Sequence, residues 1–222
     1  MVPKARDALI ALVGVWIVSV VLLPRMLPDI ASTRTPLPTR IEVDVAVHKE
    51  LATIGDSHNP DDLYFAAFRA KTLAAHGVKR IEDLPVNYGG LLIQEGERLT
   101  SELFAKAMQA DFDLQASQSV FVNRFSLLSP VIALRQMSMA LAGTDRKRHQ
   151  QFLLEAESYR YALIQALNKL HAEQVRYQND RDQRVSHRHW QDLPRFAFAP
   201  PDTAEVLGKS ARPLPCSQRG LR

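Results

Sequence analysis

Residue types that commonly do chemistry are sparse in this chain, and their spacing is unfavourable for it. His187 and His189 stand two residues apart, so an extended strand could present both to one metal ion, but no third ligand lies near them in the sequence. The lone cysteine, Cys216, lies in a basic, proline-containing stretch near the C-terminus, where nothing would activate it as a nucleophile. We therefore expect neither a metal at the histidine pair nor a catalytic role for the cysteine.

The sequence also lacks the motifs that identify common enzyme classes. It contains no GxxxxGK[ST] phosphate-binding loop, no HExxH zinc pair, no GxSxG nucleophile elbow and no Glu-x-x-His pair of a di-iron bundle. Its formal net charge of +4 is too small to indicate nucleic acid as a partner. We predict that the chain is not an enzyme and uses no cofactor.

The chain is organised around an uncharged apolar run, residues 8–24, with the sequence ALIALVGVWIVSVVLLP. As a helix it would be about 25 Å long, slightly shorter than a hydrocarbon core of about 30 Å. Met26 and Leu27 extend it if Arg25 reaches the headgroups with its guanidinium. Only a helix satisfies its own backbone in lipid, so we predict a transmembrane anchor over residues 1–27. Its membrane-spanning residues include Ala8, Leu12, Trp16, Val20 and Leu23.

Two other interpretations of the run stay open. A cleaved signal peptide also begins with basic residues, here Lys4 and Arg6, but its core is usually about 7–15 residues and a small-x-small site should follow. A buried helix of a soluble core would normally show one polar stripe, which this run lacks. Basic residues stand on both sides of the run, so the positive-inside rule does not orient it.

Prolines and helical periodicity divide the rest of the chain. We predict a proline-rich connector over 28–40, an α-helical domain over 41–177, an extended loop over 178–207 and a basic disordered tail over 208–222. The fold class is all-α, with one transmembrane helix followed by an elongated helical domain. Within the domain the expected helices are 39–55, 60–76 (capped by Asn59), 91–125, 130–142 and 146–177.

The most distinctive of these helices is 130–142. Ser129 is placed to cap it, Pro130 suits its first position, and Gly143 suits its end. Its apolar surface is interpreted first as buried against the domain, and alternatively as lying on a membrane, where Arg135 would be an anchor. The candidate membrane or partner contacts are Arg135, Met137, Met139, Arg146, Lys147, Arg148 and Trp190.

Several segments, in order, resemble a known family. They include EDLPVNYGG, LLSPVIALRQMSMALAGTD and WQDLPRFAFAPP. The chain resembles bacterial ABC-2-type transporter permeases that carry a domain of unknown function (DUF3526-like) as a large loop after a membrane helix. Relatives are described as permeases of multi-copper enzyme maturation. The resemblance extends to Pro201 and implies a bacterial inner-membrane subunit with an extracytoplasmic domain, a separate ABC ATPase and other permease subunits as partners.

The chain departs from that pattern at both ends. A permease of this kind would have several more membrane helices, whereas this sequence begins just before one helix and ends in a basic tail. We therefore expect a fragment or truncated member, whose helical loop domain contacts partner subunits or cargo outside the cytoplasm. The alternative is a single-pass, membrane-anchored adaptor or sensor domain unrelated to transport. The sequence leaves the oligomeric state open.

Overall fold

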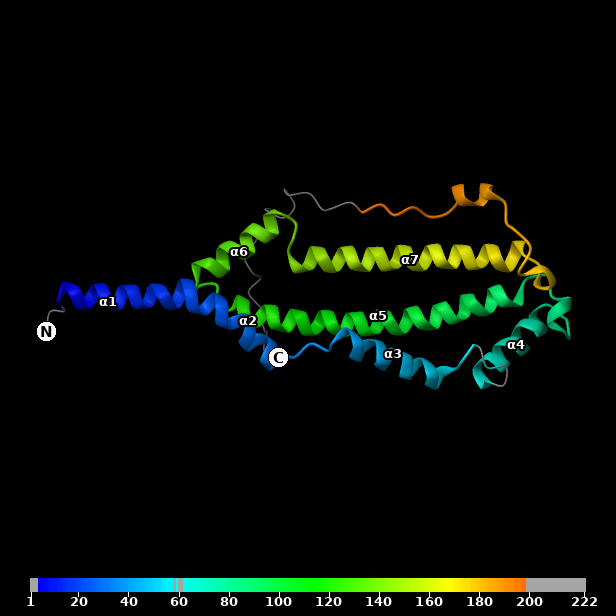
Figure 1. Cartoon of the computed structure of the whole chain (residues 1–222), viewed down its shortest axis with the longest axis horizontal. Helices are drawn as coiled ribbons and strands as arrows, with labels where there is room; N and C mark the ends of the chain where they lie inside the picture. The colour runs from blue at the N-terminus through cyan, green and yellow to red at the C-terminus, as the bar shows by residue number, and fades with distance from the viewer. Residues whose placement is uncertain (1–3, 58, 60–61, 199–222) are drawn as a thin grey trace, which may run out of the picture. The chain divides into compact units, whose positions relative to one another are not determined.

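The computed structural model describes residues 4–57, 59 and 62–198, and these residues are largely helical with no strand among them (Figure 1). The predicted all-α fold, which begins with an apolar helix, is confirmed. The elements are α1 (Ala5–Trp16), η1 (Ile17–Leu22), α2 (Leu23–Arg34), α3 (Arg40–Ile54), α4 (Leu63–Ala75), η2 (Ile81–Asp83), α5 (Tyr88–Asn123), α6 (Pro130–Leu141), α7 (Arg146–Gln174), η3 (Tyr177–Asn179) and η4 (His187–Gln191).

The chain forms two compact units. We call the first the anchor unit; it comprises Met1–Thr35, Ser117–Leu153 and Ala197–Arg222. The second, the hairpin unit, comprises Pro36–Ala116 and Leu154–Phe196. The long helices α5 and α7 each contribute residues to both units.

Within the hairpin unit, α5 and α7 run antiparallel. The Asn87 amide donates to the Ala172 carbonyl (2.7 Å), and the Gln165 Nε2 donates to the Gln94 carbonyl (3.1 Å). At Gly90 the helices approach so closely that a Cβ would lie 2.6 Å from the Ala172 backbone nitrogen, so a side chain is excluded there. The core of the unit is apolar, and its buried residues include Val47, Phe65, Tyr88, Leu99, Leu103, Phe112, Ala172 and Val175.

Helix ends follow the capping chemistry in part: the Ser129 side chain, predicted to cap α6, forms no capping hydrogen bond, whereas other ends are closed as expected. The Thr39 hydroxyl accepts from the Glu42 amide, and Glu42 accepts from the Thr39 amide, which is a complete capping box at the start of α3. The helices α4 and α6 each end on a glycine with φ +67°, Gly77 and Gly143, as predicted. The amide of each glycine and the amide of the next residue donate the two hydrogen bonds of a Schellman motif to carbonyls of the helix.

The start of α4 differs from the prediction. The helix begins at Leu63, because the Asp62 carboxylate accepts a hydrogen bond from the Phe65 amide and so caps it. The predicted cap at Asn59 is therefore wrong. The predicted first helical residue, Pro60, lies outside the described residues.

The apolar run is one continuous helical segment that includes a π-helical turn. The Leu23 amide donates to the Val18 carbonyl, a bond that spans five residues instead of four. This wider turn precedes Pro24, which has no amide hydrogen to continue the α-helical pattern. The helix then runs on to Arg34 with Pro28 inside it, so residues 28–34 are helical and only residues 35–39 of the predicted connector are not. A proline removes one donor, and neighbouring turns can hold the helix together across it.

The segment after α7 has only short helical turns, η3 and η4, in agreement with the predicted loop over its described part. It returns beside α7, since the rings of Phe196 and Tyr159 lie 5.3 Å apart. The predicted tail over 208–222 lies outside the described residues.

Candidate membrane interface

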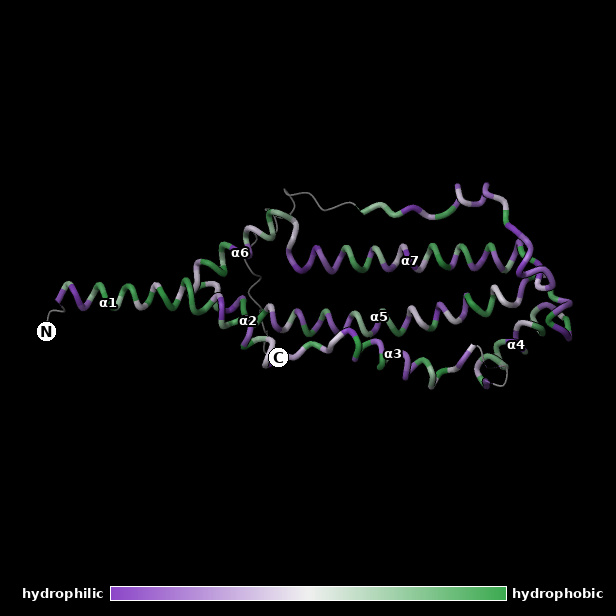
Figure 2. Tube along the Cα trace, in the orientation of Figure 1, coloured by the Kyte–Doolittle hydropathy of each residue, from purple (hydrophilic) through white to green (hydrophobic). Residues whose placement is uncertain are grey.

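The apolar run is exposed over most of its length, and only Ser19, Val20, Leu23 and Pro24 are half-buried. The helical segment Ala5–Arg34 is long and apolar enough to cross a membrane, and none of its most apolar stretch is buried. Leu12 and Trp16, both predicted to span the membrane, are exposed (Figure 2 shows the hydropathy along α1). This exposure does not fit the buried-core interpretation, whereas the anchor and signal-peptide interpretations both agree with it.

Helix α6 has apolar side chains all round but little of it is buried. Its outward face is exposed at Leu134 (69%), Met137 and Leu141, and Ile132 on the opposite face is its buried residue. The preceding turn is also apolar and exposed, with Leu127 at 96%. The first interpretation of α6, burial against the domain, is therefore wrong. The sequence showed that α6 is apolar, but periodicity alone cannot show whether other elements cover such a helix.

Helix α6 packs against the apolar run itself. One of its neighbours in the anchor unit is η1, the π-helical turn near the C-terminal end of that run. The exposed turn at Leu127 and Leu128 directly precedes α6. The anchor unit therefore presents apolar surface from two separate stretches of sequence, residues 5–34 and 127–141, that lie together.

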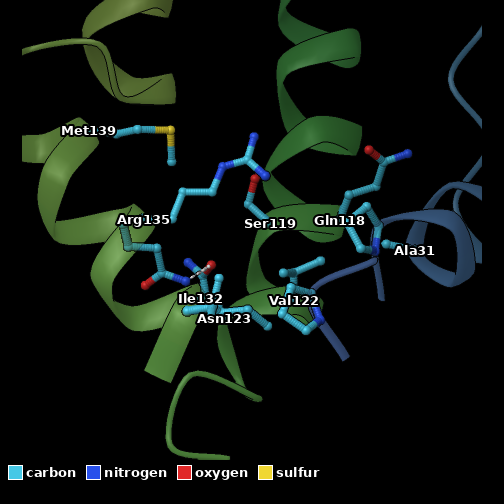
Figure 3. Close-up of a pocket in the computed structure, with 12 residues that line it drawn as sticks. Ala31, Gln118, Ser119, Val122, Asn123, Ile132, Arg135 and Met139 are labelled. Atoms are coloured by element: carbon cyan, nitrogen blue, oxygen red, sulfur yellow. Dashed lines mark hydrogen bonds between the residues drawn. The ribbon is translucent and has the colours of Figure 1, made fainter. Parts of the chain in front are cut away.

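Between α2, the end of α5 and α6 lies a groove of about 280 Å³ (Figure 3). Its walls are mainly apolar and include Pro28, Val122 and Ile132. All three amide side chains that line it take part in hydrogen bonds. The Gln118 Nε2 donates to the Thr35 carbonyl (2.6 Å), and the Gln136 Nε2 donates to the Asn123 Oδ1 (2.7 Å).

Arg135 is the one cation that lines this groove. Its side chain reaches from α6 toward Ser119 on α5 (Figure 3). It forms no hydrogen bond or ion pair with the residues that the structure describes. The groove thus combines an apolar wall with a guanidinium whose donors have no protein acceptor in that part of the chain.

The predicted contact residues divide between the two units. Arg135 and Met139 line the groove, and Met137 lies on the outward face of α6. The cluster Arg146, Lys147 and Arg148 forms the first turn of α7 in the same unit. Trp190 belongs to η4 of the hairpin unit, where it is 65% exposed. The predicted contact of Trp190 with a bilayer or a partner stays a prediction.

Charge also separates the units. In the sequence, residues 23–35 and 117–153 hold seven Lys and Arg but only two acids, Asp29 and Asp145. The hairpin unit holds fifteen Lys and Arg and nineteen Asp and Glu. The stretch next to the apolar surface is thus basic, whereas the hairpin unit is acidic.

Sequence reasoning overlooked the polar networks of the hairpin unit. Arg98 bonds to Glu95 and to Glu102, both at 2.6 Å, and Tyr64 donates to Glu95. The Arg98 guanidinium is the main cause that lowers the pKa of Glu95. Arg160 on α7 forms an ion pair with Glu97 on α5 (2.8 Å), which fixes the two helices against each other.

Asn87 is the other residue that sequence reasoning undervalued. It is 1% exposed and caps α5, because its Oδ1 accepts from the Gly89 amide (2.8 Å). Its Nδ2 donates to Asp180 (2.6 Å), whose carboxylate also lies 2.5 Å from the His171 Nε2. The hydrogen bond from His171 is the main cause that lowers the pKa of Asp180. The network joins Asn87 to His171 and Asp180, more than eighty positions away, so a local sequence pattern does not indicate it.

No such network assembles a metal site: within the described residues, no group of three or more His, Cys, Asp or Glu side chains could hold a metal ion. The networks of Arg98, Arg160 and Asn87 join helices to each other.

Comparison with known proteins gives one match. The profile of a domain of unknown function, DUF3526, matches residues 40–199. No curated protein and no solved structure matches the chain.

Proposed function

The chain belongs to the DUF3526 family, and we propose that it is a membrane-anchored subunit or fragment of an ABC-2-type transporter permease. In this proposal it resides in the bacterial inner membrane, and its helical domain contacts partner subunits or cargo outside the cytoplasm. The observation that carries the membrane part is the exposed apolar surface that α6 shares with the apolar run.

The contact between α6 and η1 strengthens the case for an anchor. If residues 8–24 cross the bilayer, η1 lies within its hydrocarbon, and part of α6 must lie at a similar depth. Exposed to water, each leucine such as Leu127 or Leu134 would forgo roughly 1.5–3 kcal/mol of transfer free energy. Acyl chains or a neighbouring membrane helix would recover it. A cleaved signal peptide would leave α6 without this neighbour.

The transporter part of the proposal rests on the resemblance of the sequence to permeases. The described residues contain one helix that could cross a membrane, and one helix cannot line a transport path, so we propose that the chain acts beside an ABC ATPase and a permease subunit with several membrane helices. Its acidic hairpin unit is the surface we assign to contact with partners or cargo. We propose no catalytic role and no cofactor for it.

A second candidate is a single-pass adaptor or sensor domain unrelated to transport. The exposed apolar surface supports it equally, because anchoring alone requires no transporter. The two candidates differ in their partners. Affinity purification of the full chain from bacterial membranes should bring down an ATPase and a multi-span permease in the first case. A folded chain that retains neither protein would favour the adaptor.

Topology is the first test of the proposal. We would fuse alkaline phosphatase, which is active only outside the cytoplasm, or green fluorescent protein after Gly208, and extract the membranes with carbonate. We expect an active phosphatase on a chain that resists extraction. A cytoplasmic reporter on a resistant chain would reverse the proposed orientation, and release of the chain by carbonate would refute the anchor.

A further inference from the structure

We propose that the groove between α2, α5 and α6 binds one anionic phospholipid, whose phosphate Arg135 holds and whose acyl chain lies on the apolar wall. This inference rests on the proposed membrane anchoring, and it adds a ligand that anchoring alone does not require. Three features of the groove support it: its expected depth in the membrane, its apolar wall and its positive charge.

The groove lies where the apolar run ends. Its α2 wall begins at Pro24, the last residue of the run, and reaches Ala31. The seven helical steps from Pro24 to Ala31 span about 10 Å. If residues 8–24 cross the bilayer, this wall extends from the edge of the hydrocarbon through the headgroup layer. A lipid at that depth presents its phosphate and the first part of its acyl chains.

The size and lining of the groove favour a lipid over a soluble ligand. Its volume, about 280 Å³, is below the roughly 300–1,000 Å³ of pockets that enclose a whole small molecule. A ligand of ordinary small-molecule size would extend beyond the groove, as an acyl chain does when it continues into the bilayer. Val122 and Ile132 provide apolar contact for its upper part.

Arg135 provides the recognition of the headgroup. Its guanidinium has five donors in a planar fork, which suits two phosphate oxygens at once. Gln118 and Gln136 already donate to protein oxygens, so Arg135 is the charged donor of the groove that lacks an acceptor in the described residues. A phosphate would supply that acceptor.

The surrounding charge favours an anionic lipid over a zwitterionic one. The stretches of sequence that form the groove, residues 23–35 and 117–153, contain seven Lys and Arg but only two acidic residues. Each basic residue near an anionic membrane surface strengthens the attraction of the chain to that surface. Phosphatidylglycerol carries a net negative charge, whereas phosphatidylethanolamine is neutral overall, so the groove should prefer the first.

Native mass spectrometry of the full chain, released from detergent micelles with either lipid added, tests this inference. We expect one phosphatidylglycerol per chain, bound at least five-fold more tightly than phosphatidylethanolamine. Arg135→Gln should lower the affinity for phosphatidylglycerol about ten-fold. Arg135→Lys keeps the charge but lacks the planar fork of donors, and it should lower the affinity about three-fold. Millimolar glycerol phosphate should not displace the lipid, because it has no acyl chain for the apolar wall.

Arg124→Gln is the matched control. Arg124 is exposed, belongs to the anchor unit and does not line the groove, so removing its charge should leave lipid binding within two-fold of the unchanged chain. An equal loss of phosphatidylglycerol affinity in Arg124→Gln and Arg135→Gln would overturn the proposed site in the groove, and it would indicate binding to a diffuse basic surface. Unchanged binding in Arg135→Gln, or no bound lipid in the unchanged chain, would also overturn it; the latter would point to a partner helix as occupant.

Carbonate extraction of the same proteins separates this inference from the proposed function. If the unchanged chain resists extraction and shows no preference for phosphatidylglycerol, only the groove inference fails. If carbonate releases the unchanged chain, the anchor fails and the lipid site fails with it. We expect Arg135→Gln to stay in the membrane, because residues 8–24 are intact.

Discussion

The anchor unit and the hairpin unit use the same residue types in opposite ways. In the hairpin unit, leucines such as Leu103 are buried and arginines such as Arg160 form ion pairs across α5 and α7. In the anchor unit, Leu134 is exposed and Arg135 has no acceptor among the described residues. The hairpin unit has a buried apolar core and an ion pair between its two long helices, although Ile41 and Leu63 are exposed. The anchor unit exposes apolar side chains and basic groups, which suits contact with a bilayer that has anionic headgroups.

One substitution made in both units gives the sharpest test of this contrast. Leu103 is 8% exposed, so Leu103→Asp would bury a carboxylate without a partner and should destabilise the fold on the order of 4 kcal/mol. Leu134→Asp should change the free energy of unfolding by less than about 0.5 kcal/mol, because that side chain is 69% exposed. Thermal melting of the full chain in detergent, followed by circular dichroism, compares the two.

The contrast breaks if both variants melt alike. An equally large loss with Leu134→Asp would mean that α6 is covered by protein after all. Leu103→Ala, which only removes apolar contacts, serves as a milder variant and should cost about 2–5 kcal/mol if Leu103→Asp fails to fold.

Two glycines of α5 test how closely the helices of the hairpin unit pack. Gly90→Ala would place a Cβ 2.6 Å from the Ala172 backbone, which cannot rotate away, so we expect a loss of about 1–3 kcal/mol. At Gly96 the nearest atom to a Cβ is the Ser57 hydroxyl at 4.0 Å, so Gly96→Ala should stabilise the helix by up to about 1 kcal/mol. The melting temperatures of the two variants should therefore shift in opposite directions. A gain in stability with Gly90→Ala would contradict the close packing.

The smallest expected effect is on the stability of the chain at low pH. The pKa of Asp180 is lower in the folded chain than its ordinary value, so this group adds stability above that ordinary value and loses it as pH falls through the folded pKa. Asp180→Asn should therefore make the decline in melting temperature between pH 5 and pH 2 shallower, by no more than about 3 °C because Asp180 is partly exposed.

Asp182→Asn is the control for the acid experiment. Asp182 is an exposed neighbour with the same charge, and its side chain takes no part in the network of Asn87 and His171. Its variant should melt like the unchanged chain at every pH. An identical response of the two variants would mean that the Asp180 contact contributes nothing to stability.

Local chemistry in the sequence predicted most of the fold. Proline at Pro130 and glycines at Gly77 and Gly143 located helix ends, because they restrict the backbone of their own residues. The cap of α4 was missed, since Asn59 and Asp62 are both good caps and only the folded chain selects between them.

The sequence could not predict features that depend on distant residues or on the surrounding medium. The network of Asn87 joins residues far apart along the chain, so no local pattern indicates it. The exposure of α6 depends on which elements fail to cover it. Arg135 was identified as a candidate contact from its type, but its place in a groove required the fold of α2, α5 and α6.

The two prolines of α2 have a consequence for how far the proposed anchor can slide. Neither Pro24 nor Pro28 has an amide hydrogen, so the carbonyls of Val20 and Pro24 lose the donor that an unbroken helix would supply four residues on. If the helix moved deeper into the hydrocarbon core, these carbonyls would have no hydrogen-bond donor. If it moved outward, apolar side chains of the run would be exposed to water. The two prolines therefore limit how far the helix can move along the membrane normal, and the backbone itself sets the depth at which the chain leaves the membrane.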